Sequence, residues 1–353
     1  MAMPVTCVSA RAALLAAALG ILGATLCGCL ERREMITVEP DGTVNIQATF
    51  ESESREEFYD FDALPTLAGL WIVGDVEEFE AAGGAADSGP RYRLEAEAKF
   101  PPDVALPENF ADAGDSRATL YLQFPTTLAL ERRKDGVYYH FHRRYAGRPW
   151  AQVESLQELL LTEPTKDLKD KKPDELTRED RRRLLRSYGE FEAAKMLLFA
   201  RQAFLEMTPE APQDGWLAVR AAVNAFQKTM DYDRILELAD IEDEDERNRE
   251  LDDATRKWRE RAFENLKESL RQHCGYGGRR LADFVAAYDA RRFAWDVMAD
   301  LSDETFEITV AMPGEIVASN ADAAGTYRAT WKFSGRRLRD ADVELMVTSR
   351  LAP

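Results

Sequence analysis

The stretch Met35–Phe50, MITVEPDGTVNIQATF, contains the clearest fold signal in the chain. Apolar and polar residues alternate along it on both sides of a central Asp41-Gly42. Alternation with a period of two is typical of a strand with one buried face, and Gly tolerates the positive φ that a tight hairpin turn requires. The stretch therefore predicts an antiparallel β-hairpin.

Strand-like alternation continues to about residue 145. It recurs in three further segments, residues 92–98, 120–124 and 137–141. The last of these follows Asp135-Gly136, a second hairpin-turn signal. Residues 56–79 instead have the apolar spacing of a helix, interrupted at Pro65, so a helix is expected between the strands.

From about residue 152 to residue 301 the pattern becomes that of amphipathic helices. Apolar residues recur there at three-, four- and seven-residue spacings, which place them on one helical face. The stretches with this spacing are 184–198, 216–230, 254–266 and 281–298. They predict four or five helices that pack together as a bundle or as antiparallel hairpins, with solenoid repeats as the alternative.

After Glu304 the alternation of strands returns, as in Phe306–Val310 and Val343–Val347. Strand-rich ends around a helical middle predict an α+β fold. In this fold the N- and C-terminal strands form one antiparallel sheet, and the helices are a long insertion. The corresponding bounds are residues 29–150 together with 302–353 for the sheet domain, and residues 151–301 for the helical insertion.

Residues 1–28 have the pattern of a lipoprotein signal peptide. Arg11 precedes an apolar run, Ala12–Leu26, that is short for a bilayer span and ends in Leu26-Cys27-Gly28-Cys29. This ending resembles the lipobox of bacterial lipoproteins, in which the last Cys receives the lipid and becomes the new N-terminus. The resemblance implies cleavage before Cys29 and acylation of Cys29, with palmitate among the acyl chains. An uncleaved N-terminal membrane helix is the alternative.

The lipobox resemblance implies that the protein lies outside the cytoplasm, attached to a membrane by lipid. In lipoproteins of bacteria with two membranes, an Asp after the lipidated Cys tends to retain the protein at the inner membrane. Leu30 occupies that position, which favours the outer membrane. The formal net charge of −18 disfavours nucleic acid and anionic lipid headgroups as partners of a broad surface.

Two C-terminal segments, Met312–Asn320 (MPGEIVASN) and Ala329–Phe333 (ATWKF), resemble a pattern in the LppM-type domain of bacterial lipoproteins. The shared features are a Pro-Gly, a short hydrophobic stretch, an Asn and a later Trp within a strand. The resemblance covers the two strand regions. It implies an α+β envelope-facing domain with a ligand-binding role and no shared catalytic residues. The alternative explanation for the same residues is turn chemistry and a buried Trp331.

Three groups of side chains have the residue types of a metal or catalytic site. His140 and His142 share one face of a predicted strand, but a structural metal site needs further ligands, which are not visible in the sequence. The acidic run Asp240–Glu246 lacks the Gly of an EF-hand loop, and acids at a helix start favour the helix dipole; weak calcium binding is the alternative. Cys274, beside His273, ends a predicted helix, where the dipole disfavours a thiolate and the next glycines predict a C-cap.

The sequence therefore predicts no catalytic residue, no metal and no cofactor. It contains no Gly-x-Ser-x-Gly elbow, phosphate-binding loop or His-Glu-x-x-His motif. The expected function is that of a non-enzymatic envelope lipoprotein, anchored through Cys29, that binds an envelope protein or an apolar ligand. The alternative is an envelope hydrolase that uses a pair of carboxylates on cell-wall glycan.

Overall fold

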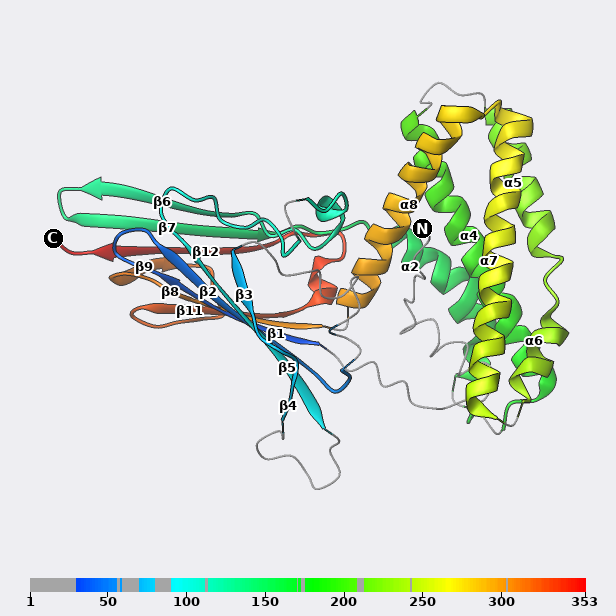
Figure 1. The fold of residues 1–353 in the computed structure, drawn as a ribbon, viewed down its shortest axis with the longest axis horizontal. Helices are drawn as coiled ribbons and strands as arrows, with labels where there is room; N and C mark the ends of the chain where they lie inside the picture. Colours follow the sequence, from blue (N-terminus) through cyan, green and yellow to red (C-terminus); the bar gives the residue numbers. More distant parts are fainter. Residues whose placement is uncertain are drawn as a thin grey trace. The chain divides into compact units, whose positions relative to one another are not determined.

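The computed structural model of the protein describes residues 30–55, 58, 70–79, 90–111, 114–169, 171–172, 175–207, 213–241, 243–302 and 304–353. These residues form two compact units. The sheet unit contains the described parts of 30–150 and 293–353, and the helical unit contains those of 151–292. The fold is α+β, as predicted. In the order of the chain, shown by the colours of Figure 1, the long helical region follows the N-terminal strands and precedes the C-terminal strands.

The larger sheet, sheet A, has the strand order β10-β11-β8-β1-β2-β5-β3, with β4 also paired to β5. Its strands are β1 (Glu31–Val38), β2 (Val44–Ser52), β3 (Trp71–Val73), β4 (Glu77–Phe79), β5 (Arg91–Phe100), β8 (Thr305–Ala311), β10 (Ala323–Ala324) and β11 (Arg328–Ser334). Strands β1 and β2 form the hairpin predicted from Met35–Phe50, and Gly42 has a φ of 92° at its turn. The β1–β8 pair is parallel.

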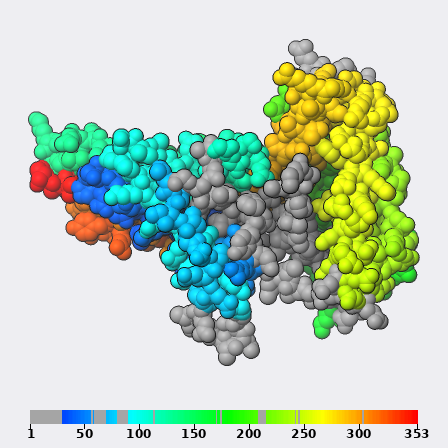
Figure 2. Space-filling model, viewed as in Figure 1, coloured from blue at the N-terminus to red at the C-terminus, as the bar shows by residue number. Residues whose placement is uncertain are grey.

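The smaller sheet, sheet B, has the order β6-β7-β12-β9. Its strands are β6 (Thr126–Arg133), β7 (Gly136–Tyr145), β9 (Glu315–Ser319) and β12 (Val343–Leu351). Strands β6 and β7 are joined at the predicted Asp135-Gly136 turn. The C-terminal strand β12 pairs with β7 along its whole length, and its end, in red, lies beside the β6–β7 hairpin (Figure 2). Each sheet therefore combines strands from both ends of the chain.

The prediction of one antiparallel sheet is wrong in two details: the strands divide between two sheets, and β1 and β8 pair in parallel. Residues 120–124, which were predicted to form a strand, instead belong to the connection between β5 of sheet A and β6 of sheet B. Ala118–Leu120 forms a single 3-10 turn, and the buried side chains of Tyr121, Leu122 and Phe124 follow it. The Gln123 side chain donates hydrogen bonds to the carbonyl groups of Ala118 and Tyr121. A side chain thus replaces a neighbouring strand as the partner of this backbone.

The helix expected over residues 56–79 is not found in residues 70–79, which form β3 and β4 at the edge of β5. Trp71 explains part of this difference, because its ring packs edge-on against the rings of Phe100 and Phe110. Pairing with an existing strand and packing against its core outweigh the local helical spacing. Apart from Phe58, the remainder of the predicted helix lies outside the described residues.

One hydrophobic core fills the space between the two sheets. Sheet A contributes side chains such as Ile36 and Trp331, and sheet B contributes Phe141 and Leu345. The C-terminal turns of α8 (Gly278–Leu301) add Val297, Met298 and Leu301 to the same core. The part of α8 from Phe293 onward therefore belongs to the sheet unit, although it lies within the range expected for the helical insertion.

The helical unit contains the predicted stretches 184–198, 216–230 and 254–266, together with residues 281–292 of the fourth stretch. Its elements are α2 (Ala151–Gln157), a π-helical stretch (Glu158–Thr162), α3 (Glu163–Thr165), a 3-10 turn (Lys166–Leu168), α4 (Arg178–Met207), α5 (Gln213–Gln227), α6 (Tyr232–Ala239), α7 (Glu244–Cys274) and the first part of α8. Asp231 caps the start of α6 by accepting a hydrogen bond from the backbone N–H of Arg234. Within the described part of the chain, no helix has the length and apolar character that a membrane span requires.

Candidate functional site

A groove of about 400 Å³ lies on sheet A, at the end where β1 and β8 begin and β11 ends. Strand β8 lies between the other two, so Thr305 and Glu307 occupy the centre of the groove. Arg33 of β1 and Lys332 of β11 flank them, because the strand registers pair both residues with Glu307. The groove therefore presents charged side chains from both ends of the chain.

Strand alternation decides which charges reach this outer face. On β1, Ile36 and Val38 point into the core, so the residues of opposite phase, Glu31 and Arg33, point outward. The same rule brings Lys332 to the outer face of β11, between the buried residues on either side of it. Arg33 and Lys332 are 48% and 66% exposed, so both cations are available to a ligand.

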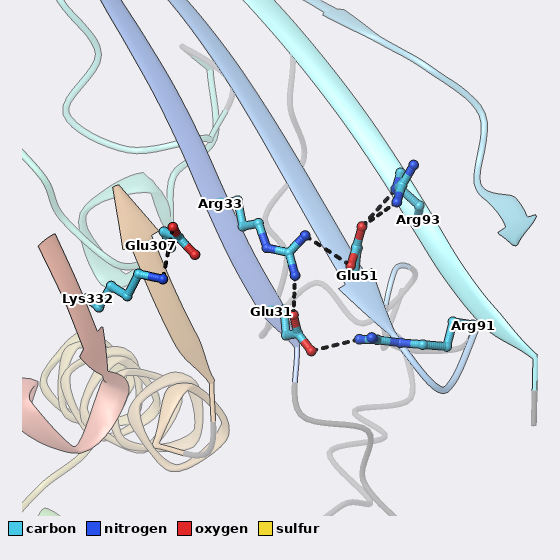
Figure 3. Close-up of polar contacts among 7 residues, drawn as sticks. All are labelled: Glu31, Arg33, Glu51, Arg91, Arg93, Glu307 and Lys332. Atoms are coloured by element: carbon cyan, nitrogen blue, oxygen red, sulfur yellow. Dashed lines mark hydrogen bonds and ion pairs between the residues drawn. The ribbon is translucent and has the colours of Figure 1, made fainter. Parts of the chain in front are cut away.

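Arginines and glutamates alternate across β1, β2 and β5 beside the groove (Figure 3). Glu31 accepts hydrogen bonds from Arg33 at 2.7 Å and from Arg91 at 2.8 Å. Arg33 also lies 3.4 Å from Glu51, whose second partner, Arg93, is at 2.6 Å. Arg33 thus bridges two carboxylates, and the network holds its guanidinium at the rim of the groove.

The carboxylates of the groove are suited to accepting hydrogen bonds. Glu307 forms an ion pair with Lys332, with 3.1 Å between Oε1 and Nζ. Burial opposes the ionisation of Glu31, but the hydrogen bonds and charges of Arg91 and Arg33 outweigh it and hold the pKa of Glu31 below its usual value. Glu31 is therefore an anion at neutral pH and not a proton donor.

A second set of charges lies inside the sheet unit and was not predicted. Glu34 of β1 and Arg143 of β7 form an ion pair at 2.5 Å with both side chains fully buried. Tyr145 donates to Glu34 at 3.1 Å, and Arg143 Nε donates to the Thr126 hydroxyl at 2.8 Å. Burial raises the pKa of Tyr145, so its hydroxyl keeps its proton as the donor. The pair joins sheet A to sheet B.

The sequence contained a signal for this buried pair. Glu34 lies two residues before Ile36 on a strand, so both side chains point to the same, buried face of β1. Arg32 has the same orientation and forms an ion pair with Glu304 at 3.1 Å. Its guanidinium lies over the rings of Phe50 and Phe306, at 5.3 and 5.1 Å from their centroids. Cation–π contacts of this kind compensate part of the cost of burying the charge. Both buried pairs fix the packing of the sheet unit.

The residues of the C-terminal pattern come together in the structure. Trp331 is 4% exposed, as predicted, and its Nε1 donates to Asn320 Oδ1 at 2.9 Å. The same oxygen accepts from the Met346 N–H at 2.8 Å, and Asn320 Nδ2 donates to the Glu344 carbonyl at 2.8 Å. Asn320 therefore ties β11 of sheet A to β12 of sheet B, which gives this motif a structural role.

The Pro313-Gly314 turn packs closely against β12. Gly314 has a φ of 83°, and a Cβ at this position would lie 2.3 Å from the carbonyl oxygen of Arg350. The Ser349 hydroxyl donates to the Pro313 carbonyl at 2.8 Å. Both the backbone conformation and the close approach require Gly here.

The residue expected to be lipidated, Cys29, lies outside the described residues. His140 and His142 lie on the outer face of sheet B, where His140 Nδ1 is 3.1 Å from the Thr348 hydroxyl and Nε2 is 3.5 Å from Glu131. In the described parts of the chain, His, Cys, Asp and Glu side chains form no group of three or more that could hold a metal ion.

The other two candidate groups have structural roles at helix ends. Asp243 of the acidic run caps α7 by accepting a hydrogen bond from the Glu246 N–H at 2.8 Å. Cys274 is the last residue of α7, and Gly275 follows as a left-handed C-cap with a φ of 67°. These findings confirm the predicted helix start and C-cap. Burial raises the pKa of the Cys274 thiol, which opposes a nucleophilic role.

No family model matches the chain, and no curated protein is similar to it at a significant level. Among solved structures, it is similar to the NMR structure of the folded domain of the Mycobacterium tuberculosis protein LppM. The sequences are 9% identical, the match covers 92% of this chain and 91% of that domain, and the TM-score is 0.27. A likeness this distant supports no inference about function.

Proposed function

We propose that the protein is a lipoprotein of the bacterial cell envelope with a non-enzymatic binding role. The observation that carries the proposal is the lipobox-like Leu26-Cys27-Gly28-Cys29, which ends two residues before Glu31, the first residue of β1 and part of the groove. Acyl chains on Cys29, palmitate among them, attach the protein to the membrane, and Leu30 after the anchor favours the outer membrane.

The chemistry of the groove supports binding better than hydrolysis. A glycan hydrolase needs two facing carboxyl groups, one with a raised pKa that serves as the acid. In the groove the pKa of Glu31 is lowered. Burial does raise the pKa of Asp289 on α8, but the charged groups that act on Asp289 are Arg292 and Lys267. Both of these groups are cations, whereas hydrolysis requires a second carboxylate.

Metabolic labelling with an alkyne analogue of palmitate tests the anchor. We expect the wild-type chain and Cys27→Ala to be labelled equally and Cys29→Ala to lose the label, because only Cys29 has the small Gly28 before it. Equal labelling of all three chains contradicts acylation of Cys29.

Capture from detergent-solubilised envelopes tests the binding role. The wild-type protein should retain a specific envelope protein or ligand, identified by mass spectrometry, and Arg33→Gln should retain less of it because the groove loses a cation. Cleavage of cell-wall glycan by the purified protein, with no specific ligand retained, would overturn the proposal in favour of a hydrolase.

A further inference from the structure

The groove on sheet A is a surface of mixed charge. Arg33 and Glu31 form one cation–carboxylate pair on β1, and Lys332 and Glu307 form the other across β11 and β8. Neighbouring strands lie about 4.8 Å apart, so positive and negative groups alternate over the width of three strands. The Lys332–Glu307 pair lies on one side of β1, and the Arg33 and Glu31 side chains are directed to its other side, toward Glu51 and Arg91 (Figure 3). A ligand in this groove therefore has a donor and an acceptor on each side.

This arrangement discriminates between ligand charges. A simple anion would interact favourably with Arg33 and Lys332 but would approach the carboxylates of Glu31 and Glu307, in a protein with a net charge of −18. A simple cation would meet the two basic side chains. A zwitterion satisfies both sets, because its anionic group accepts from Arg33 and Lys332 while its cationic group donates to the carboxylates.

The place of the groove in the chain indicates where such a zwitterion comes from. Glu31 follows Cys29 by two positions, with only Leu30 between them. A chain of that length spans at most about 7 Å. If Cys29 is acylated, as in the proposed function on which this step rests, Glu31 and Arg33 lie at the depth of the lipid headgroups. The ligands present at that depth in high concentration are phospholipid headgroups.

We propose that the groove binds the headgroup of a zwitterionic phospholipid that carries a primary amine, of the phosphatidylethanolamine type. Arg33 and Lys332 bind its phosphate, and Glu31 and Glu307 accept hydrogen bonds from its ammonium group. A quaternary ammonium has no N–H to donate, so a choline headgroup is bound more weakly. The acyl anchor and the groove then act together, and the groove fixes the orientation of sheet A at the membrane surface.

Flotation with lipid vesicles tests this proposal on the chain carrying Cys29→Ser, so that no acyl chain contributes. We expect stronger binding to phosphatidylcholine vesicles that contain phosphatidylethanolamine than to pure phosphatidylcholine vesicles. Lys332→Gln and Glu307→Gln should each reduce this preference, by up to about tenfold for the loss of one charged hydrogen bond. Arg328→Gln is the matched control, because Arg328 is exposed on the same face of the same strand but lies outside the groove.

Equal binding to both vesicle types overturns the proposal, as does a preference that survives both groove substitutions. Binding to phosphatidylglycerol alone would assign the groove to anions instead. Binding of soluble phosphoethanolamine without vesicle binding would assign it to a free small molecule and overturn the membrane assignment. The labelling of Cys29 is measured separately from vesicle binding. A negative vesicle result therefore does not contradict acylation of Cys29, and a negative labelling result does not affect the measured headgroup preference.

Discussion

The buried pair of Glu34 and Arg143 allows a quantitative test of how the two sheets are held together. Glu34→Leu leaves the Arg143 guanidinium buried without its counterion, and Arg143→Met does the same to the Glu34 carboxylate. Either single substitution should lower the free energy of unfolding by about 3–5 kcal/mol, the usual cost of leaving one charge of a buried pair uncompensated. An exposed pair has no such cost, because water solvates the remaining charge.

The double variant Glu34→Leu/Arg143→Met should be much less damaging than the sum of the two. It removes both charges and leaves mainly the Tyr145 hydroxyl without its acceptor, at a cost of about 1–3 kcal/mol. The coupling energy of the cycle should therefore be at least about 3 kcal/mol. Urea unfolding, monitored by tryptophan fluorescence, gives the free energy of unfolding of the wild type, the two single variants and the double variant.

The control for this cycle is Arg133→Met, which removes an ion pair with Glu131 at 2.6 Å in which both side chains are about half exposed. Its effect should be at most about 1 kcal/mol. Single variants at Glu34 and Arg143 that cost no more than this control, or a double variant whose cost equals their sum, would refute the argument that burial makes the pair strong.

Three further predictions concern positions where the structure is specific. Trp331→Ala should lower the free energy of unfolding by about 3–5 kcal/mol, whereas Trp331→Phe, which mainly loses the hydrogen bond to Asn320, should cost about 1–2 kcal/mol in the same urea assay. Gly314→Ala should lower the melting temperature, because φ is positive and the Cβ meets backbone, while Gly277→Ala, with open space around its Cβ, should change it little. Since burial raises the pKa of Cys274, its alkylation by iodoacetamide near pH 8 should be slower than in the urea-unfolded chain and should accelerate as the pH rises; equal rates would contradict this.

Local features of the sequence predicted the elements well where each element depends on its own neighbours. The hairpin at Asp41-Gly42 and the C-cap after Cys274 are turns that glycine permits by its backbone freedom alone. The acidic start of α7 follows from the unpaired N–H groups at a helix N-terminus. The alternation predicted around Ile36 and Val38 continues through the earlier residues of β1 in the structure, where it turns Arg33 outward.

The tertiary structure decided how these elements combine. The division of the strands into two sheets and the parallel pairing of β1 with β8 depend on contacts between opposite ends of the chain. The same contacts place Lys332 across β8 from Arg33 and enclose Glu34 with Arg143, although nothing near these residues in the sequence specifies the partner. The physical reason is that periodicity records which face of a strand is buried, whereas the choice of neighbouring strand is set by the packing of the whole core.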